Sequence, residues 1–128
     1  MTADVPFFSD DVFYRALHPL HHLDSRGNVI APAFSPSSNG TGCSVSWGKL
    51  RSPETTAMDF YERWKQYGPV RVASVSAQDC WDCSHEVYWR PIPEDNVAHC
   101  ELVVDGSVSR NQQDVARRKL ARLARIVV

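Results

Sequence analysis

The stretch that most constrains the fold runs from Glu86 to Val104, because two β-prone segments there flank a proline-rich turn. Residues 87–89, Val-Tyr-Trp, favour a strand, and residues 100–104 form a second apolar run. The prolines between the two segments lack an amide hydrogen and cannot continue a strand. We therefore expect two central strands of a sheet, with Asn96 and His99 in or beside the turn.

The length and composition of the chain fit one domain, residues 1–128, with 43% apolar and 23% charged residues. A net charge of -1 gives no overall field that would attract nucleic acid or an anionic membrane. No apolar run approaches the roughly 20 residues that span a bilayer, and residues 1–10 are acidic where a signal peptide would be basic. We expect a cytoplasmic protein with no membrane partner and with a loosely ordered start at residues 1–10.

Hydrophobic periodicity predicts the remaining elements. Alternation at 12–17, 43–47 and 70–76 favours strands. A helix at 53–67 opens with an N-cap serine and a proline, and a basic amphipathic helix is expected at 110–127. The fold class is thus α+β: one domain with a largely antiparallel sheet of four or five strands and two helices. Residues 32–42, rich in Ser, Pro, Asn and Gly, are expected to form an exposed loop that could cover a site.

The four cysteines are Cys43, Cys80, Cys83 and Cys100. They could form a four-thiolate zinc site, or a redox pair at the single Cys-x-x-Cys motif. A structural zinc site usually has two such motifs, and only one is present. We favour free, mostly buried thiols, since free cysteine behaves as a small hydrophobic residue.

Three histidines, His18, His21 and His22, fall in one short loop and could bind zinc or iron together with His99. Their spacing matches no helical zinc motif. The alternative is that His18 packs against the end of a strand while its two neighbours are solvated. We favour that alternative and assign no metal.

A second polar group combines Arg15 with Ser44 and Ser46. Arginine binds phosphate bidentately, and a strand hydroxyl can orient a ribose, so the group suits a nucleotide-type, phosphate-bearing ligand. The order Phe-Tyr-Arg, a flexible loop, Gly-Cys-Ser-Val-Ser-Trp and then a helix resembles the Arg and Ser-x-Ser elements of ADP-ribosyltransferase-type domains.

The chain departs from the pattern of that family late in the sequence. No Glu-x-Glu pair occurs there, and Glu86, Glu94 and Glu101 stand singly. The resemblance therefore implies an NAD-using transferase on the condition that one of these glutamates faces Arg15.

The elements Tyr-Arg-x-x-His-Pro, Ser-Val-Ser-Trp and Asn-x-Ala-His are also similar to small uncharacterised bacterial proteins. This similarity brings no activity or cofactor, but it suggests that Arg15, His18, Ser44, Asn96 and His99 form one local site. Within it, His18 and His99 are the candidate acid and base. The simpler alternative is that Asn96 serves the turn and His99 bonds a backbone carbonyl.

The last segment, residues 110–128, contains six basic residues against Asp114, a local charge of +5. It could bind a protein partner with an acidic surface, and nucleic acid less readily, because no aromatic side chains for base stacking lie nearby. Basic residues also simply solvate the exposed face of a helix. Two function classes remain: an enzyme acting on a phosphate-bearing small molecule, or a non-catalytic interaction module that uses this helix.

Overall fold

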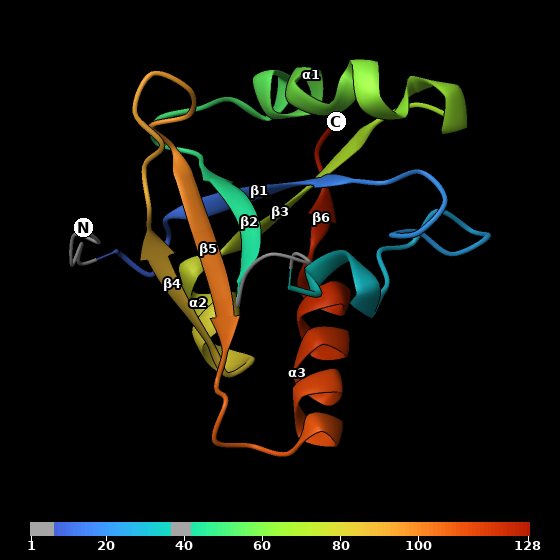
Figure 1. Ribbon diagram of the computed structural model, residues 1–128. Coiled ribbons are helices and arrows are strands. Elements are labelled where there is room, and N and C mark those ends of the chain that lie inside the picture. The colour runs from blue at the N-terminus through green and yellow to red at the C-terminus, as the bar shows by residue number, and fades with distance from the viewer. Residues whose placement is uncertain (1–6, 37–41) are drawn as a thin grey trace.

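The computed structural model describes residues 7–36 and 42–128. Within them the chain forms one antiparallel sheet of six strands, in the order β4-β5-β2-β1-β3-β6, with helices on both of its faces (Figure 1). The expected α+β class with a single antiparallel sheet is confirmed. The sheet has more strands than the four or five expected.

The strands are β1 (Val12–Leu17), β2 (Cys43–Trp47), β3 (Arg71–Ser76), β4 (His85–Trp89), β5 (His99–Val104) and β6 (Arg125–Ile126). The helices are α1 (Pro53–Trp64), α2 (Ala77–Asp82) and α3 (Arg110–Leu123), and the short 3-10 helices are η1 (Ala31–Phe34) and η2 (Lys65–Tyr67). The short helix α2 is an addition to the two that the sequence predicts. It begins where Ser76 and Asp79 form a reciprocal capping box.

The junction between β1 and β2 is short. Only two residue pairs face each other there, Phe13 with Trp47 and Tyr14 with Ser46. Beyond these pairs β1 crosses β2 at a steep angle, as Figure 1 shows. The sheet therefore consists of two halves, β4-β5-β2 and β1-β3-β6, which separate next to the second half of β1.

Alternation along the strands gives the sheet two unlike faces. One face carries the main core, where side chains of the strands pack with η1 and α3. The largest buried side chains of this core include Phe13, Leu17, Phe34, Leu102 and Leu120. The other face carries Ser44, Ser46, His99 and Glu101, which the pairing register places on the same side of β2 and β5. Helix α1 lies across this second face (Figure 1).

The pair of strands from Glu86 to Val104 does not form the centre of the sheet, contrary to expectation. β4 is an edge strand and β5 its neighbour, while β2 and β1 occupy the middle. The aromatic residues of β4 fit an edge because Tyr88 and Trp89 are only partly buried. An aromatic strand can therefore border the sheet as well as fill its interior.

The loop at residues 32–42 is less exposed than its composition predicts. Ala33 and Phe34 are buried in the core as part of η1. Residues 37–41, the centre of the expected lid, lie outside the described residues. At the start of the chain, residues 1–6 also lie outside them. Phe7 packs edge-on against Phe13 and Trp47, so the expected loose order does not extend to it.

Helix α3 is shorter than the expected 110–127. It ends at Leu123 because Ala124 adopts an extended conformation, with φ of -65° and ψ of 138°, and the chain then pairs with β3 as β6. Leu120 is fully buried, whereas Leu123 and Val127 are exposed. Ala116 and Ala121 are also buried, so with Leu120 they form the apolar side of α3.

Candidate functional site

Four of the six predicted site residues meet in one pocket on the second face of the sheet. Ser44 and Ser46 come from β2, His99 from the start of β5 and Asn96 from the turn before it. The pocket has a volume of about 60 Å³, and α1 roofs it with Thr56, Asp59 and Phe60. Tyr14 and Ala16 of β1 complete the walls, so the pocket lies where the two halves of the sheet separate.

His99 makes a directed pair of contacts through its two ring nitrogens. Its Nδ1 lies 2.8 Å from the carbonyl oxygen of Arg90, and its Nε2 lies 3.2 Å from the hydroxyl of Ser44. A carbonyl only accepts hydrogen bonds, so in the neutral ring Nδ1 carries the proton and Nε2 presents its lone pair. The Ser44 hydroxyl can then donate to Nε2. This is the arrangement of an oriented base beside a hydroxyl.

Glu101, one of the late glutamates, lies on the same face of the sheet beside Ser44, although it is not among the residues that line the pocket. It pairs directly with Ser44 across β5 and β2, and it follows His99 by two positions on the same face. Its Oε1 lies 2.9 Å from Nη1 of Arg90. The two-residue spacing between His99 and Glu101 is the sequence signal for this position, since alternate residues of a strand share a face.

Gly42 shows how closely the backbone approaches this carboxylate. A Cβ atom at Gly42 would lie 2.6 Å from Oε1 of Glu101 and 2.8 Å from its Cβ. Only glycine leaves room for Glu101 in its present position. The backbone before β2 thus holds the carboxylate from one side, while Arg90 holds it from the other.

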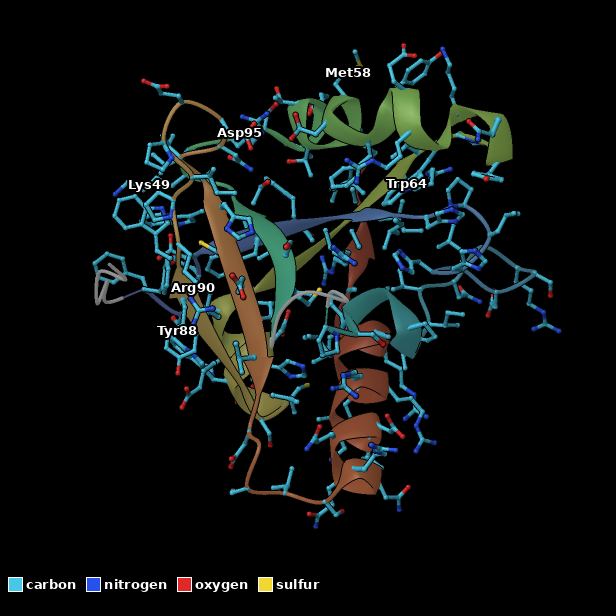
Figure 2. The ribbon with its side chains drawn as sticks, in the orientation of Figure 1. Lys49, Met58, Trp64, Tyr88, Arg90 and Asp95 are labelled. Carbon is cyan, nitrogen blue, oxygen red and sulfur yellow. The ribbon has the colours of Figure 1, made fainter. Side chains whose placement is uncertain are left out.

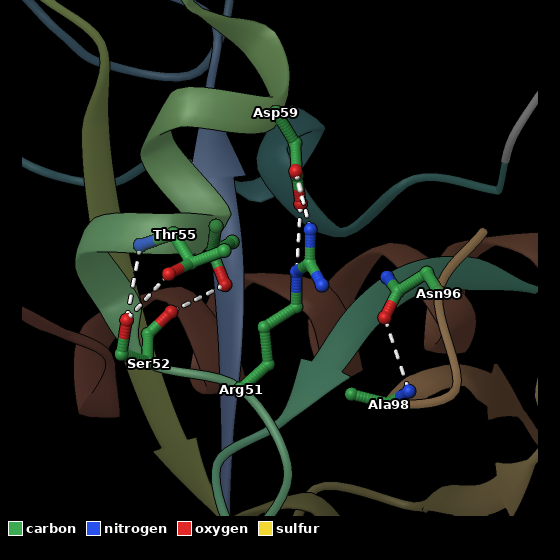
Figure 3. A network of polar contacts seen from close by, with 7 residues as sticks. Arg51, Ser52, Thr55, Asp59, Asn96 and Ala98 are labelled. Atoms are coloured by element: carbon green, nitrogen blue, oxygen red, sulfur yellow. Dashed lines mark hydrogen bonds and ion pairs between the residues drawn. The ribbon is translucent and has the colours of Figure 1, made fainter. Parts of the chain in front are cut away.

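The mouth of the pocket carries a bidentate ion pair. Arg51 donates from Nε and Nη2 to the carboxylate of Asp59, at 2.9 and 2.5 Å, and Asp59 lines the pocket. Asn96 lies across from this pair in Figure 3, with its Oδ1 accepting from the amide of Ala98 at 3.0 Å. That bond fixes the turn and leaves the Nδ2 side of the amide toward Arg51 (Figure 3).

Arg15 does not enter the pocket. Its position on β1 places it on the core face, where Nε donates to the carbonyl of Ala33 at 2.8 Å and Nη1 to that of Ser44 at 2.9 Å. The guanidinium thus bridges η1 and β2 in the space where β1 and β2 separate. Arg15 therefore holds the backbone of Ser44, and the structure does not bring it into the pocket that contains His99.

His18 also lies apart from the pocket. Its ring stacks on His21 with centroids 4.3 Å apart and contacts Trp64 at 5.1 Å and Tyr67 at 5.1 Å. Trp64 projects from α1 toward this loop in Figure 2. This arrangement fits the expectation that His18 packs at the strand end. It does not fit the expectation that His18 and His99 act together as acid and base.

His22 anchors the same loop, because its Nδ1 accepts from the backbone amide of His18 at 2.8 Å. Burial, with the charges of Arg15 and the neighbouring histidines, lowers the pKa of His22 to about 4. A neutral His22 is therefore part of the packing under α1. In residues 7–36 and 42–128, no group of three or more His, Cys, Asp or Glu side chains could hold a metal ion.

All four cysteines are free and buried, as favoured from the sequence. Cys80 and Cys83 lie in and just after α2 without forming a disulfide. Burial raises the pKa of both thiols, as it does for Cys43 and Cys100. A raised pKa opposes formation of the reactive thiolate, so these residues contribute packing to the core.

No helix among the described residues is both long and apolar enough to cross a bilayer. No protein-family model matches the chain, and no curated protein or solved structure matches it.

Proposed function

We propose that the protein is an enzyme that transfers a group from a nucleotide-type, phosphate-bearing small molecule, as in ADP-ribosyltransferases. The observation that carries this proposal is the meeting of Ser44, His99 and Glu101 on one face of β2 and β5. Arg15 on β1, the Ser-x-Ser element on β2 and Glu101 on β5 occupy three adjacent strands. Arg15 lies on the core face and Glu101 on the opposite face, so the condition that a late glutamate faces Arg15 is not met. The proposal therefore rests on the cluster of Ser44, His99 and Glu101 and not on the resemblance.

Each residue of the cluster has a distinct role in such a transfer. Cleavage of a glycosidic bond to ribose develops positive charge on the sugar, and the carboxylate of Glu101 would stabilise that charge. Ser44 and Ser46 would orient the ribose hydroxyls. His99, with its free Nε2 lone pair, would take the proton of the attacking hydroxyl group or water. With NAD as donor, the bond to nicotinamide breaks, and nicotinamide leaves with the bonding electrons.

We assign phosphate binding to Arg51 and not to Arg15, which the sequence suggested. Arg15 is a positioning residue in this proposal, because both of its bonds hold backbone carbonyls on the core face. Arg51 at the pocket mouth uses Nε and Nη2 for Asp59, and within the described residues its Nη1 has no partner. A phosphate could bind there. The pocket of about 60 Å³ then holds only the reacting end of the molecule.

The proposal is tested by incubating the purified protein with NAD and measuring released nicotinamide by chromatography. We expect slow release by the native protein and at least a roughly hundredfold loss for Glu101→Gln, consistent with removal of a transition-state contact. Glu86→Gln is the matched control, since Glu86 lies on the edge strand β4 opposite Val103, and not opposite a residue of the cluster. Equal effects of the two changes, or no release and no binding of NAD or ADP-ribose, would reject the proposal.

A further inference from the structure

A groove lies between α3 and η1, on the opposite face of the sheet from the pocket. It consists of two adjoining hollows of about 340 and 350 Å³ that share Ala31, Pro32 and Arg118. Residues 29–32 and Ser35 form one wall, and Arg117, Arg118, Ala121 and Arg122 form most of the other. We call this feature the α3–η1 groove.

The charge of the α3–η1 groove is positive and partly uncompensated. Arg117 pairs with Asp114 at 3.2 Å, on the rim of the first hollow. Arg118 and Arg122 are exposed, and in the described part of the chain neither guanidinium has a hydrogen-bond or ion-pair partner. Three arginines against one aspartate leave the lining with a net charge of +2. An anionic occupant is therefore favoured.

The spacing of the two free arginines specifies the form of that occupant. Four residues along a helix advance about 6 Å, at about 1.5 Å per residue. Alternate residues of an extended peptide lie about 6.6 Å apart and point to the same side. Two carboxylates separated by one residue can therefore meet Arg118 and Arg122 together, each through a bidentate contact.

The wall opposite the arginines is aliphatic and includes Val29, Ile30 and Ala31, while Ala121 adds a methyl group from the α3 side. Such a surface accepts an apolar side chain that flanks the acidic pair. We infer that the α3–η1 groove binds an extended acidic peptide segment of a partner protein, with the pattern acidic-x-acidic next to an aliphatic residue. Among the residues that the structure describes, the groove lining contains no aromatic side chain that could stack on a base, which favours peptide over single-stranded nucleic acid.

The probe is a fluorescein-labelled peptide with two glutamates separated by valine and followed by leucine, measured by fluorescence anisotropy against the full chain. The double variant Arg118→Glu with Arg122→Glu should weaken binding at least about tenfold, which corresponds to about 1.4 kcal/mol. Affinity should also fall as salt is added, because both arginines are exposed. A peptide with glutamines in place of the glutamates should bind no better than background.

The matched control is Arg110→Glu with Lys119→Glu, which makes the same change of charge on α3 outside the groove. We expect it to bind the probe within about twofold of the native protein, with thermal unfolding confirming that both double variants fold. Equal losses in the two variants would show general electrostatic attraction and overturn the inference. So would absence of probe binding below about 1 mM, or tighter, groove-dependent binding of a short single-stranded DNA. The inference does not rest on the proposed function, because neither double variant touches the pocket.

Discussion

The Nε2 atom of His99 lies 3.2 Å from the hydroxyl oxygen of Ser44, although the two residues are 55 positions apart in the chain. The antiparallel pairing of β5 with β2 creates this contact, and the carbonyl of Arg90 orients the ring from its other nitrogen. Glu101 adds a carboxylate directly opposite Ser44. A base, a hydroxyl and a carboxylate are therefore held by the backbone of two adjacent strands.

Arg15 should behave as a structural residue. Replacing it with alanine leaves the carbonyls of Ala33 and Ser44 without their side-chain donor. We expect a loss of about 2 kcal/mol or more in the free energy of unfolding, measured by urea denaturation. Arg15→Lys keeps the charge but cannot reproduce the planar group that reaches both carbonyls. Its free energy of unfolding should therefore lie between those of the native protein and Arg15→Ala. Unchanged stability with lost ligand binding would instead restore Arg15 as an anion clamp.

The packing of α3 gives a second prediction. Leu120 is fully buried, so Leu120→Ala should lower the free energy of unfolding by about 2 to 5 kcal/mol. Leu123→Ala makes the same chemical change on the same helix, at a side chain that is 44% exposed. It should cost less than about 1 kcal/mol. Similar losses for both variants would mean that α3 packs by a different face.

The loop at His18–His22 should make stability depend on pH. Burial lowers the pKa of His22 to about 4, and it also lowers the pKa values of His18 and His85. The unfolded chain therefore takes up protons first as the pH falls below about 6.5, and stability should decrease from there toward about pH 4. The groups facing His22 are Arg15, His18 and His21, all of which oppose its protonation.

Thermal unfolding between about pH 7 and pH 4.5 measures this effect. His22→Asn, which retains an acceptor for the amide of His18, should flatten the dependence between these limits. His21→Asn removes an exposed imidazole from the same loop and should leave most of the dependence in place. A native protein whose melting temperature stays constant over the range would contradict a neutral, packed His22.

Local patterns predict much of the fold, because they depend on residues close together in the chain. The alternation of residues 43–47 gives the bounds of β2, and Ser52 caps α1 as its position before Pro53 indicates. The order of the strands depends on long-range pairing that no short pattern contains. The apolar, aromatic run in β4 therefore predicts a strand without revealing that the strand lies at an edge.

The candidate site, too, is predicted only in part by local patterns. Alternation along β2 places Ser44 and Ser46 on one face, as the sequence predicts, whereas their meeting with His99 depends on the register of β5 against β2. Arg15 lies on β1 and His18 directly follows that strand, yet Arg15 is on the other face of the sheet and His18 contacts Trp64 beyond the strand end. Sequence order does not reveal these positions. They follow from the early separation of β1 from β2 and from the contact between the histidine loop and Trp64.

The central claim is that His99, in its Nδ1-protonated form, accepts a hydrogen bond from Ser44. Long-range ¹H–¹⁵N correlation spectra of the histidine rings test it directly, because the two nitrogens of a neutral imidazole report which one carries the proton. The account predicts a protonated Nδ1 and an unprotonated Nε2 for His99. It also predicts a shift of the Nε2 resonance in Ser44→Ala that is absent in Ser74→Ala, a change on β3 outside the pocket. A protonated Nε2, or spectra that do not respond to Ser44→Ala, would contradict it.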